Sequence, residues 1–279
     1  MTHQIDSFIT TGMNGRSGST QKAYRYSLER FNEYLEGSGG LLDNLTRLDV
    51  QSYVSWMQTV KKKAASSVLR EYAAVAAFCH WSNQDTALKD IRLPQAPKIL
   101  NVAPKSLGKN DRNRLLRDVE RTKNLRNMAI INLLIRTGLR VAELVSLNRN
   151  DVKMGARRDS SYITIIGKGN KERKIPLSAE ARQYLKEYLD ARQDNCEALF
   201  ATEKGSPKRL SVRAIQKLCS HYEINPHMLR HTRAKSLVDA GVDLSTVAEI
   251  LGHADINVTR RYTKPTMDEM LKAMDKTDF

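Results

Sequence analysis

The chain has 279 residues, 41% of them hydrophobic, which is enough for two domains with apolar cores. Lys and Arg number 46 against 31 Asp and Glu, and this charge of +15 favours a nucleic-acid partner, the alternative being a generally basic protein without one. The N-terminus lacks the regions of a secretory signal, and no apolar run approaches the roughly 20 residues of a membrane span. Three cysteines at scattered spacing argue against a disulfide framework and fit a reducing cytoplasm.

Residues 1–90 show the apolar spacing of helices. In "STQKAYRYSLERFNEYLEG", Ser19 or Thr20 is a candidate N-cap and Gly37 a candidate end, and the apolar residues between them recur at helical spacing: Tyr24, Leu28, Phe31 and Leu35. The stretches "DVQSYVSWMQTV" and "SSVLREYAAVAAFCHW" also place their apolar residues on one face: Val50, Tyr53, Val54 and Met57 in the first, and Val68, Leu69, Tyr72, Val75 and Cys79 in the second. We therefore predict a helical domain over residues 1–92.

This helical region contains a run of three lysines and is followed by a proline-rich stretch. In "VKKKAAS", three lysines are candidates for phosphate contacts, the alternative being a solvated helix end: Lys61, Lys62 and Lys63. The stretch "LKDIRLPQAPKILNVAPKSLGKND" holds three of the seven prolines, Pro94, Pro97 and Pro104, and has no sustained periodicity. Because proline removes backbone donors and favours extended chain, residues 93–107 are predicted to be a linker.

A second domain is predicted over 108–279. Helices are expected around 109–122 and 124–137, with a third starting near Val141. "SSYITIIGKGNKERKIPL" then has two β-prone runs around a Gly- and Asn-containing turn, which predicts a β-hairpin, or two strands of a small sheet, with Lys168 at the turn. The remainder is again helical in pattern, and "STVAEILGH" places Val247, Ile250 and Leu251 on one face before Gly252 ends the helix. The predicted fold class is mainly α with a small antiparallel β-sheet, in two domains.

Polar residues of this second domain stand where helices begin or end. "TGLRVAEL" sets Arg140 within reach of Glu143 across one helical turn. "NPHMLRHT" sets His227 and Arg230 three apart, and "LGHADINVTRRY" contains His253 and Tyr262. Each residue alone is more often a cap, a surface residue or a core residue, but their conjunction and order indicate a site.

This set is suited to phosphodiester cleavage. Arg140 and Arg230 offer planar donors to the non-bridging oxygens of a phosphate. Lys168 or a histidine can protonate the leaving oxygen. Tyr262 would be the nucleophile, and because a phenol has a pKa of about 10, we expect its cationic surroundings to favour the phenolate.

Two other site types fit the residues less well. "HMLRH" places His227 and His231 at the separation of a helical zinc pair, but Met228 stands where H-E-x-x-H has its glutamate, and no third ligand is obvious. "GKGNKE" lacks the spacing and the following Ser or Thr of a P-loop. We predict no metal site and no cofactor, and interpret the second motif as a hairpin turn.

The motifs "TGLRVAEL", "IIGKGNKERKIPL" and "HMLRHTRAKSLVDAGVDLSTVAEILGHADINVTRRYT" together closely resemble the tyrosine recombinase (phage integrase) family, most of all its compact Xer-like and transposon-encoded resolvase or integrase members. The resemblance covers about 105–265, and the helical N-terminal part looks like the family's core-binding, SAM-like domain. It implies a site in which Arg140 and Arg230 match the two motif arginines, Lys168 the hairpin general acid, His227 and His253 the active-site histidines, Tyr262 the nucleophile, and Glu143 an accessory acidic residue that orients the arginine.

The resemblance also implies a reaction. Tyr262 would attack a phosphodiester of double-stranded DNA to give a 3′-phosphotyrosyl link and a free 5′-hydroxyl, and a partner strand's 5′-hydroxyl would reverse the step. The ester conserves the bond energy, so neither ATP nor metal is required. Two such exchanges through a Holliday junction imply a homotetramer on DNA.

Two segments leave alternatives open. The tail 263–279 has an apolar stripe that would dock onto a neighbouring protomer or pack on its own domain: Met267, Met270, Leu271 and Met274. After "LRHT", Arg233 departs from the apolar residue of many relatives, and it and Lys235 are either extra DNA contacts or solvated. The competing functions are a type IB-like DNA topoisomerase and a non-catalytic DNA-binding regulator. The target site, and the choice between resolution, integration and chromosome-dimer resolution, are left open.

Overall fold

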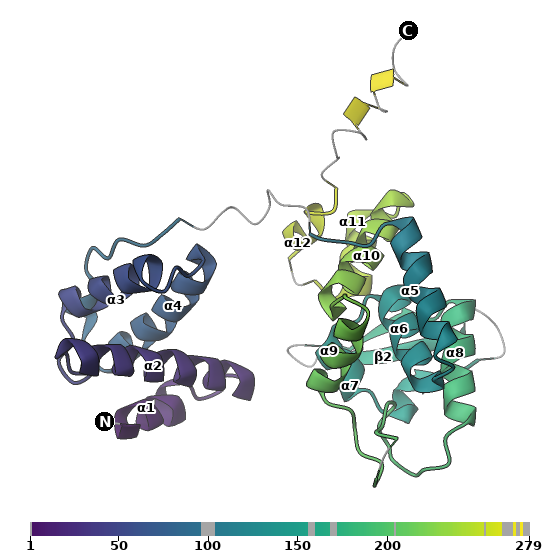
Figure 1. Cartoon of the computed structure of the whole chain (residues 1–279), viewed down its shortest axis with the longest axis horizontal. Helices are drawn as coiled ribbons and strands as arrows, with labels where there is room; N and C mark the ends of the chain where they lie inside the picture. The colour runs from purple at the N-terminus through teal and green to yellow at the C-terminus, as the bar shows by residue number, and fades with distance from the viewer. Residues whose placement is uncertain are drawn as a thin grey trace. The chain divides into compact units, whose positions relative to one another are not determined.

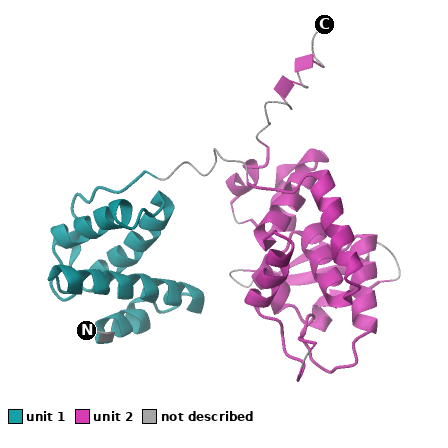
Figure 2. Cartoon of the chain, in the orientation of Figure 1, with its two compact units in different colours: residues 1–99 teal, residues 100–279 magenta. Residues whose placement is uncertain are grey.

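The computed structural model describes residues 2–95, 104–155, 160–167, 172–203, 205–253, 255–263, 270–271 and 274–275. The chain divides into two compact units, residues 1–99 and 100–279 (Figure 2), and the division falls within the stretch 93–107 that was predicted to be a linker. Both units are mainly helical, and unit 2 contains a small antiparallel sheet, which confirms the predicted fold class. Among the described residues, no helix is long and apolar enough to cross a membrane.

Unit 1 is entirely helical in its described part (Figure 1). Helix α1 (Thr2–Ser7) continues into a π-helical turn (Phe8–Gly12). Three longer helices follow: α2 (Gly18–Ser38), α3 (Arg47–Thr59) and α4 (Ala65–Trp81), with a 3-10 turn at Asp85–Leu88 after them. The four apolar residues predicted for one face of α3 are all buried, as are Leu28, Phe31 and Leu35 of α2.

The predicted ends of α2 are wrong by a few residues. The N-cap is Ser17, in an extended conformation with its hydroxyl accepting from the backbone N–H of Thr20, so that Ser19 and Thr20 lie in the first turn. At the other end Gly37 is helical, and the cap is Gly39. Several residues at each end are able to cap, and local pattern does not choose among them.

A buried carboxylate holds the helices of unit 1 together. Glu71 of α4 is 4% exposed. Its Oε1 lies 2.6 Å from Lys63 Nζ and 3.1 Å from Arg30 Nη1, and its Oε2 accepts a hydrogen bond of 2.9 Å from the hydroxyl of Tyr53. Glu71 therefore links α2, α3 and α4 through partners that compensate its burial.

Unit 2 is built around helix α6 (Leu125–Thr137), which is buried over most of its circumference. Helices α5 (Lys109–Arg121), α8 (Ala179–Asp190) and α10 (Pro226–Asp239) pack against it. The remaining helices are α7 (Val141–Ser146), α9 (Val212–His221), α11 (Leu244–Leu251) and α12 (Asn257–Arg260), and a 3-10 turn lies at Arg149–Asp151.

The sheet of unit 2 has the strand order β1-β2-β3. Strands β2 (Tyr162–Ile166) and β3 (Glu172–Pro176) pair antiparallel with Ile163 opposite Ile175, which confirms the predicted hairpin. Strand β1 (Val152–Lys153) pairs with β2 and was not predicted. Its two residues are too few for a period-2 pattern to be recognised.

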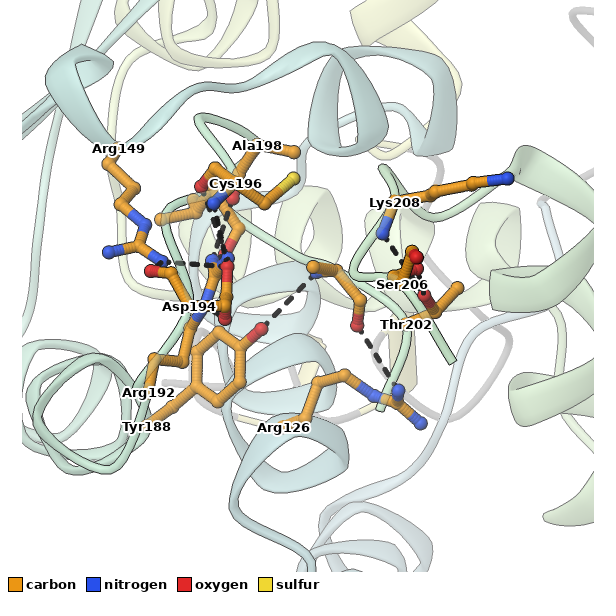
Figure 3. A network of polar contacts seen from close by, with 12 residues as sticks. Arg126, Arg149, Tyr188, Arg192, Asp194, Cys196, Ala198, Thr202, Ser206 and Lys208 are labelled. Carbon is orange, nitrogen blue, oxygen red and sulfur yellow. Dashed lines mark hydrogen bonds and ion pairs between the residues drawn. The ribbon is translucent and has the colours of Figure 1, made fainter. Parts of the chain in front are cut away.

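The segment after α8 is fixed by an arginine–carboxylate network (Figure 3). Arg192 donates to the carbonyl groups of Ala198 and Leu199 over 2.7 and 2.8 Å, and to the carboxylate of Asp194. Asp194 in turn accepts from Arg149 at 3.0 Å. These bonds anchor the segment against the 3-10 turn, so its polar backbone is satisfied without regular secondary structure.

Glu71→Gln should destabilise unit 1 by roughly 3 kcal/mol, because it leaves two partly buried cations without their carboxylate. Urea unfolding followed by tryptophan fluorescence is a selective measurement, since both tryptophans of the chain, Trp56 and Trp81, belong to this unit. The control is Asp6→Asn, which breaks an ion pair with Arg25 in which both side chains are at least one-third exposed and should change stability by less than about 1 kcal/mol. Equal effects of the two substitutions would contradict the structural role of Glu71.

Candidate active site

Helices α6 and α11 of unit 2 end close to each other. Each is followed by a glycine in the left-handed conformation, Gly138 with φ 72° and Gly252 with φ 66°, where residues with side chains are strained. A Cβ atom on Gly138 would lie 2.6 Å from Leu251 Cδ2, so glycine also permits the close approach. The last carbonyl groups of the two helices thereby become neighbours.

Arg230 of α10 bridges these two helix ends. Its side chain donates to the carbonyl of Gly138 over 2.7 Å and to that of Leu251 over 2.6 Å, and the residue is 4% exposed. Burial, together with the charge of Arg140, lowers the pKa of Arg230 to about 10. The guanidinium therefore stays charged at neutral pH, and the negative ends of the helix dipoles stabilise it.

Arg140 approaches the same place from the start of α7. It is the N-cap residue of that helix, and its Nη2 donates to the carbonyl of Gly252 over 2.8 Å. Its side chain is 40% exposed, against the almost complete burial of Arg230. The pair consists of one fixed guanidinium and one that still faces solvent.

Glu143 neutralises part of this charge. Its Oε1 accepts from Arg140 Nη1 at 2.9 Å, and its Oε2 accepts from the Arg140 backbone N–H at 2.8 Å and from Arg173 Nη2 at 2.9 Å. Burial alone would raise the pKa of Glu143, but the bonds from Arg173 and Arg140 outweigh it, and the pKa is lowered. The predicted contact between Arg140 and Glu143 is confirmed, and the carboxylate is ionised there.

His253 lies just beyond the end of α11. Its Nδ1 is 2.8 Å from the hydroxyl oxygen of the fully buried Thr259. Burial lowers its pKa to about 4, with further contributions from the charges of Arg230 and Arg140. At neutral pH this imidazole is uncharged, so it serves as a hydrogen-bonding group among cations without adding to their repulsion.

Tyr262 contacts His231 of α10. The phenolic oxygen lies 2.6 Å from His231 Nδ1. Burial lowers the pKa of His231 to about 4, and the charges of Arg261, His227 and Arg230 act in the same direction. A neutral imidazole accepts the phenolic hydrogen, so His231 can hold the hydroxyl of Tyr262.

The expectation that cationic surroundings make Tyr262 more acidic is wrong for this structure. The residue is 7% exposed and packs with apolar residues of α10 and α11. Burial raises its pKa, and the opposing effects of Arg230 and Arg261 do not overcome it. Desolvation of the phenolate thus outweighs attraction by the nearby cations.

The other candidate residues of unit 2 have different surroundings. Lys168 lies outside the described residues, and so does Met267 of the tail. His227 is exposed at the start of α10. Lys235 pairs with Asp239 at 3.1 Å, whereas Arg233 is partly buried and turned toward α5 and α6.

The three lysines of unit 1 are also not equivalent. Lys63 is bound to Glu71 and is 15% exposed. Lys61 is exposed with its ammonium 4.9 Å from the centre of the Trp56 ring, and Lys62 is exposed with a φ of 47°. Of the three, Lys61 and Lys62 present their charges to solvent, and a phosphate contact of the run remains a prediction.

Three site residues were missed from the sequence: Arg173, His231 and Thr259. An arginine two residues before the buried Ile175 on strand β3 was a usable signal, because alternation places both on the inner face. His231 was considered as half of a zinc pair only. No local pattern marks Thr259, because its contact with His253, six residues earlier, depends on how the chain turns between them.

The assembled groups are suited to binding a phosphate beside a hydroxyl nucleophile. Two guanidiniums converge, and both have N–H groups beyond those given to backbone carbonyls. Uncharged His253 is close enough to both for their charges to lower its pKa, and Tyr262 close enough to Arg230 to be affected by it. This arrangement provides anion binding together with a potential nucleophile.

The stability of unit 2 should fall as the pH is lowered from 6.5 toward 4. In that window unfolded histidines, with an ordinary pKa of 6.5, bind protons that folded His231 and His253 do not, so protonation favours the unfolded chain. Calorimetric unfolding between pH 6.5 and 4 should show a smaller loss of stability for the double variant His231→Asn/His253→Asn than for the unaltered protein. NMR titration of the two rings in the folded protein gives a direct check, and protonation midpoints near 6.5 would be incompatible with the buried site.

Comparison with known proteins places the chain in a family. Residues 105–269 match the phage integrase family, and residues 11–84 match the phage integrase N-terminal SAM-like domain. Tyrosine recombinase XerC of Corynebacterium glutamicum is 31% identical over 277 residues, covering 94% of this chain and 86% of the relative.

Solved structures show the same fold. The XerH site-specific recombinase bound to its difH substrate has a TM-score of 0.69 at 22% identity, covering 92% of this chain and 79% of the other. The Tn1549 transposon integrase in complex with circular intermediate DNA has a TM-score of 0.69 at 20% identity, covering 98% of each chain. With both domains of the family present and full-length relatives at 31% identity, the chain belongs to the phage integrase family and is a tyrosine recombinase of the Xer-like kind.

Proposed function

We propose that this recombinase breaks and rejoins double-stranded DNA at specific sites with Tyr262 as its nucleophile, in the resolution or integration of a mobile element. The observation that carries the proposal is the convergence of Arg140 and Arg230 on the ends of α6 and α11, in the neighbourhood of Tyr262 and two uncharged histidines. A phosphodiester is the anion that such a pair recognises and that a tyrosine hydroxyl can attack.

In the proposed reaction a neutral histidine of the site accepts the proton of the Tyr262 hydroxyl. The phenolic oxygen forms a bond to phosphorus, and the bond from phosphorus to the 5′ oxygen breaks. Arg140 and Arg230 stabilise the charge of the pentacoordinate transition state, and Glu143 orients Arg140. Lys168 gives the departing oxygen its proton. His227 and His253 complete the site. A 5′-hydroxyl of a partner strand then reverses the step, and the proposal includes no metal or cofactor.

Burial of the tyrosine sets a condition on this reaction. Tyr262 is 7% exposed and its hydroxyl is held by His231. We propose that the segment that carries Tyr262 moves when DNA binds, so that the phenolic oxygen leaves His231 and reaches the phosphate. Separation from His231 and loss of apolar packing are the energetic terms that oppose this movement, and contacts to DNA have to offset them.

The proposed partners are duplex DNA and further copies of the chain. The net charge of +15 supports a polyanion, and among proteins with this fold XerH is bound to difH and the Tn1549 integrase to circular intermediate DNA. We propose that residues 1–92 and 108–279 both contact the duplex, with Lys61, Lys62, Arg233 and Lys235 as candidate contacts. Four protomers would form the synapse, and the tail 263–279 would dock onto a neighbouring protomer.

Tyr262→Phe should abolish covalent attachment to DNA, because it removes the attacking oxygen and little else. The protein is mixed, without metal or ATP, with supercoiled DNA from its own genomic neighbourhood, quenched with denaturant and digested. Mass spectrometry should then find nucleotide on the Tyr262 peptide of the unaltered protein and of Tyr222→Phe, a control in the same unit. An adduct that persists in Tyr262→Phe would refute this nucleophile, and relaxation of the DNA by isolated monomers would favour a topoisomerase.

Glu143→Gln should slow adduct formation by as much as about 100-fold, the lower end of the effect of losing one transition-state donor. The carboxylate accepts from Arg140 Nη1 at one oxygen and from the Arg140 backbone N–H and Arg173 at the other. The amide has one accepting oxygen and an NH₂ group that only donates, so it cannot replace both sets of bonds, and Arg140 loses its orientation. Single-turnover cleavage at saturating DNA separates this effect from DNA affinity, which should change little. Glu249→Gln, an equal change of charge on the exposed side of α11, is the control, and equal rates for the two variants would contradict the role of Glu143.

A further inference from the structure

A second arginine cluster lies apart from Arg140 and Arg230. Arg112 of α5, Arg136 of α6 and Arg233 of α10 line a cavity of about 230 Å³. The other polar side chains of its wall are neutral: Asn113, Thr232 and Ser236. Each of three helices therefore contributes one arginine to the cavity, and the described residues that line it include no Asp or Glu.

The charges of this cluster are poorly compensated. Arg136 Nη1 lies 3.5 Å from the carboxylate of Glu180, which is 56% exposed, and Arg136 Nε donates to Asn132 Oδ1 over 3.2 Å. Arg112 Nη1 donates to the hydroxyl of Ser236 over 3.5 Å, at the outer limit of a hydrogen bond. Such contacts leave most guanidinium N–H groups of the cluster available for another acceptor.

Arg233 is the most affected member. Its Nε is buried and has no hydrogen-bond partner among the described residues. Burial lowers its pKa, and the charges of Arg136 and Arg112 lower it further. A partly buried cation facing two like charges is unfavourable unless an anion joins them, since neither desolvation nor repulsion is offset otherwise.

From the convergence of these three guanidiniums on one cavity, we propose that it binds a phosphate group. Planar guanidinium donors fit the oxygens of a phosphate in pairs. The volume is below that of sites for drug-sized ligands, roughly 300 Å³ and more, so it suits a single phosphate rather than a nucleotide. The source is either a DNA backbone phosphate, which rests on the proposed function, or free inorganic phosphate.

The cavity adjoins the support of the proposed active site. A Cβ atom on Gly138 would lie 3.3 Å from Arg233 Cγ, and the carbonyl of the same glycine accepts from Arg230. Gly138 thus lies beside Arg233 of the second cluster, and its carbonyl holds Arg230 of the first. A phosphate in the cavity would be bound beside the scissile-phosphate site without sharing its arginines.

The test follows the arginine Nε–H signals of the full chain by NMR, in a Tyr262→Phe background that excludes cleavage. Inorganic phosphate is titrated at constant ionic strength, and Arg233→Gln and Arg121→Gln assign the two signals. We expect a saturable shift of the Arg233 signal. The Arg121 signal serves as the internal control, because this side chain is 77% exposed on α5. In Arg112→Gln, apparent phosphate affinity at Arg233 should fall by about tenfold or more, as for loss of one charge-assisted hydrogen bond.

The second arm adds duplex DNA to the same sample. If a backbone phosphate occupies the cavity, the Arg233 signal shifts when DNA is added and no longer responds to inorganic phosphate. In that case Arg233→Gln also lowers the slope of log DNA affinity against log salt concentration by about one, relative to Arg121→Gln. If phosphate still titrates Arg233 on DNA, the free ion is the ligand. No saturable shift in either arm overturns the proposal. Neither arm depends on the Tyr262 adduct, so this inference and the proposed function fail independently.

Discussion

The site of this protein depends on one interaction, the capture of arginine side chains by the carbonyl ends of two helices. Helices α6 and α11 both stop at a left-handed glycine, and the carbonyl groups left without helical partners there accept from Arg230 and Arg140. Each helix end satisfies its own backbone by binding a cation, and each cation is held where the helix dipole is negative. For this reason Arg230 can be buried although no carboxylate among the described residues contacts it directly.

Charge in the remainder of the site is arranged around that pair. Glu143 takes up part of the positive charge, and Arg173 holds the carboxylate from the strand side. The two histidines remain uncharged because a further cation in this place would have to be desolvated among arginines. Tyr262 follows the same rule, since burial keeps its proton on the hydroxyl despite the nearby cations.

Three of the buried or half-buried charge clusters in the described part of the chain differ in their compensation. In unit 1, Glu71 is surrounded by two cations and a phenol, which accounts for its structural role. Around Arg140 and Arg230, backbone carbonyls and Glu143 compensate most of the charge while N–H groups remain for an anion. Around Arg233 the described carboxylate contact is that of Glu180, which is 56% exposed and 3.5 Å from Arg136 Nη1. An uncompensated cluster is costly in the free protein and is stabilised by a bound anion, which supports the proposed phosphate site.

Helix positions and the hairpin could be predicted from the sequence, because apolar periodicity and turn residues act over a few positions. The four buried residues of α3, the end of α11 at Gly252 and the contact of Arg140 with Glu143 are of this kind. Only the tertiary structure decided that His231 meets Tyr262, that Arg173 meets Glu143, and that Tyr262 is less acidic than its neighbouring arginines suggest. The two contacts join residues about 30 positions apart, and no local pattern encodes which helices and strands bring them together. The pKa of Tyr262 depends on how deeply the phenol is buried, and the packing of the helices sets that burial.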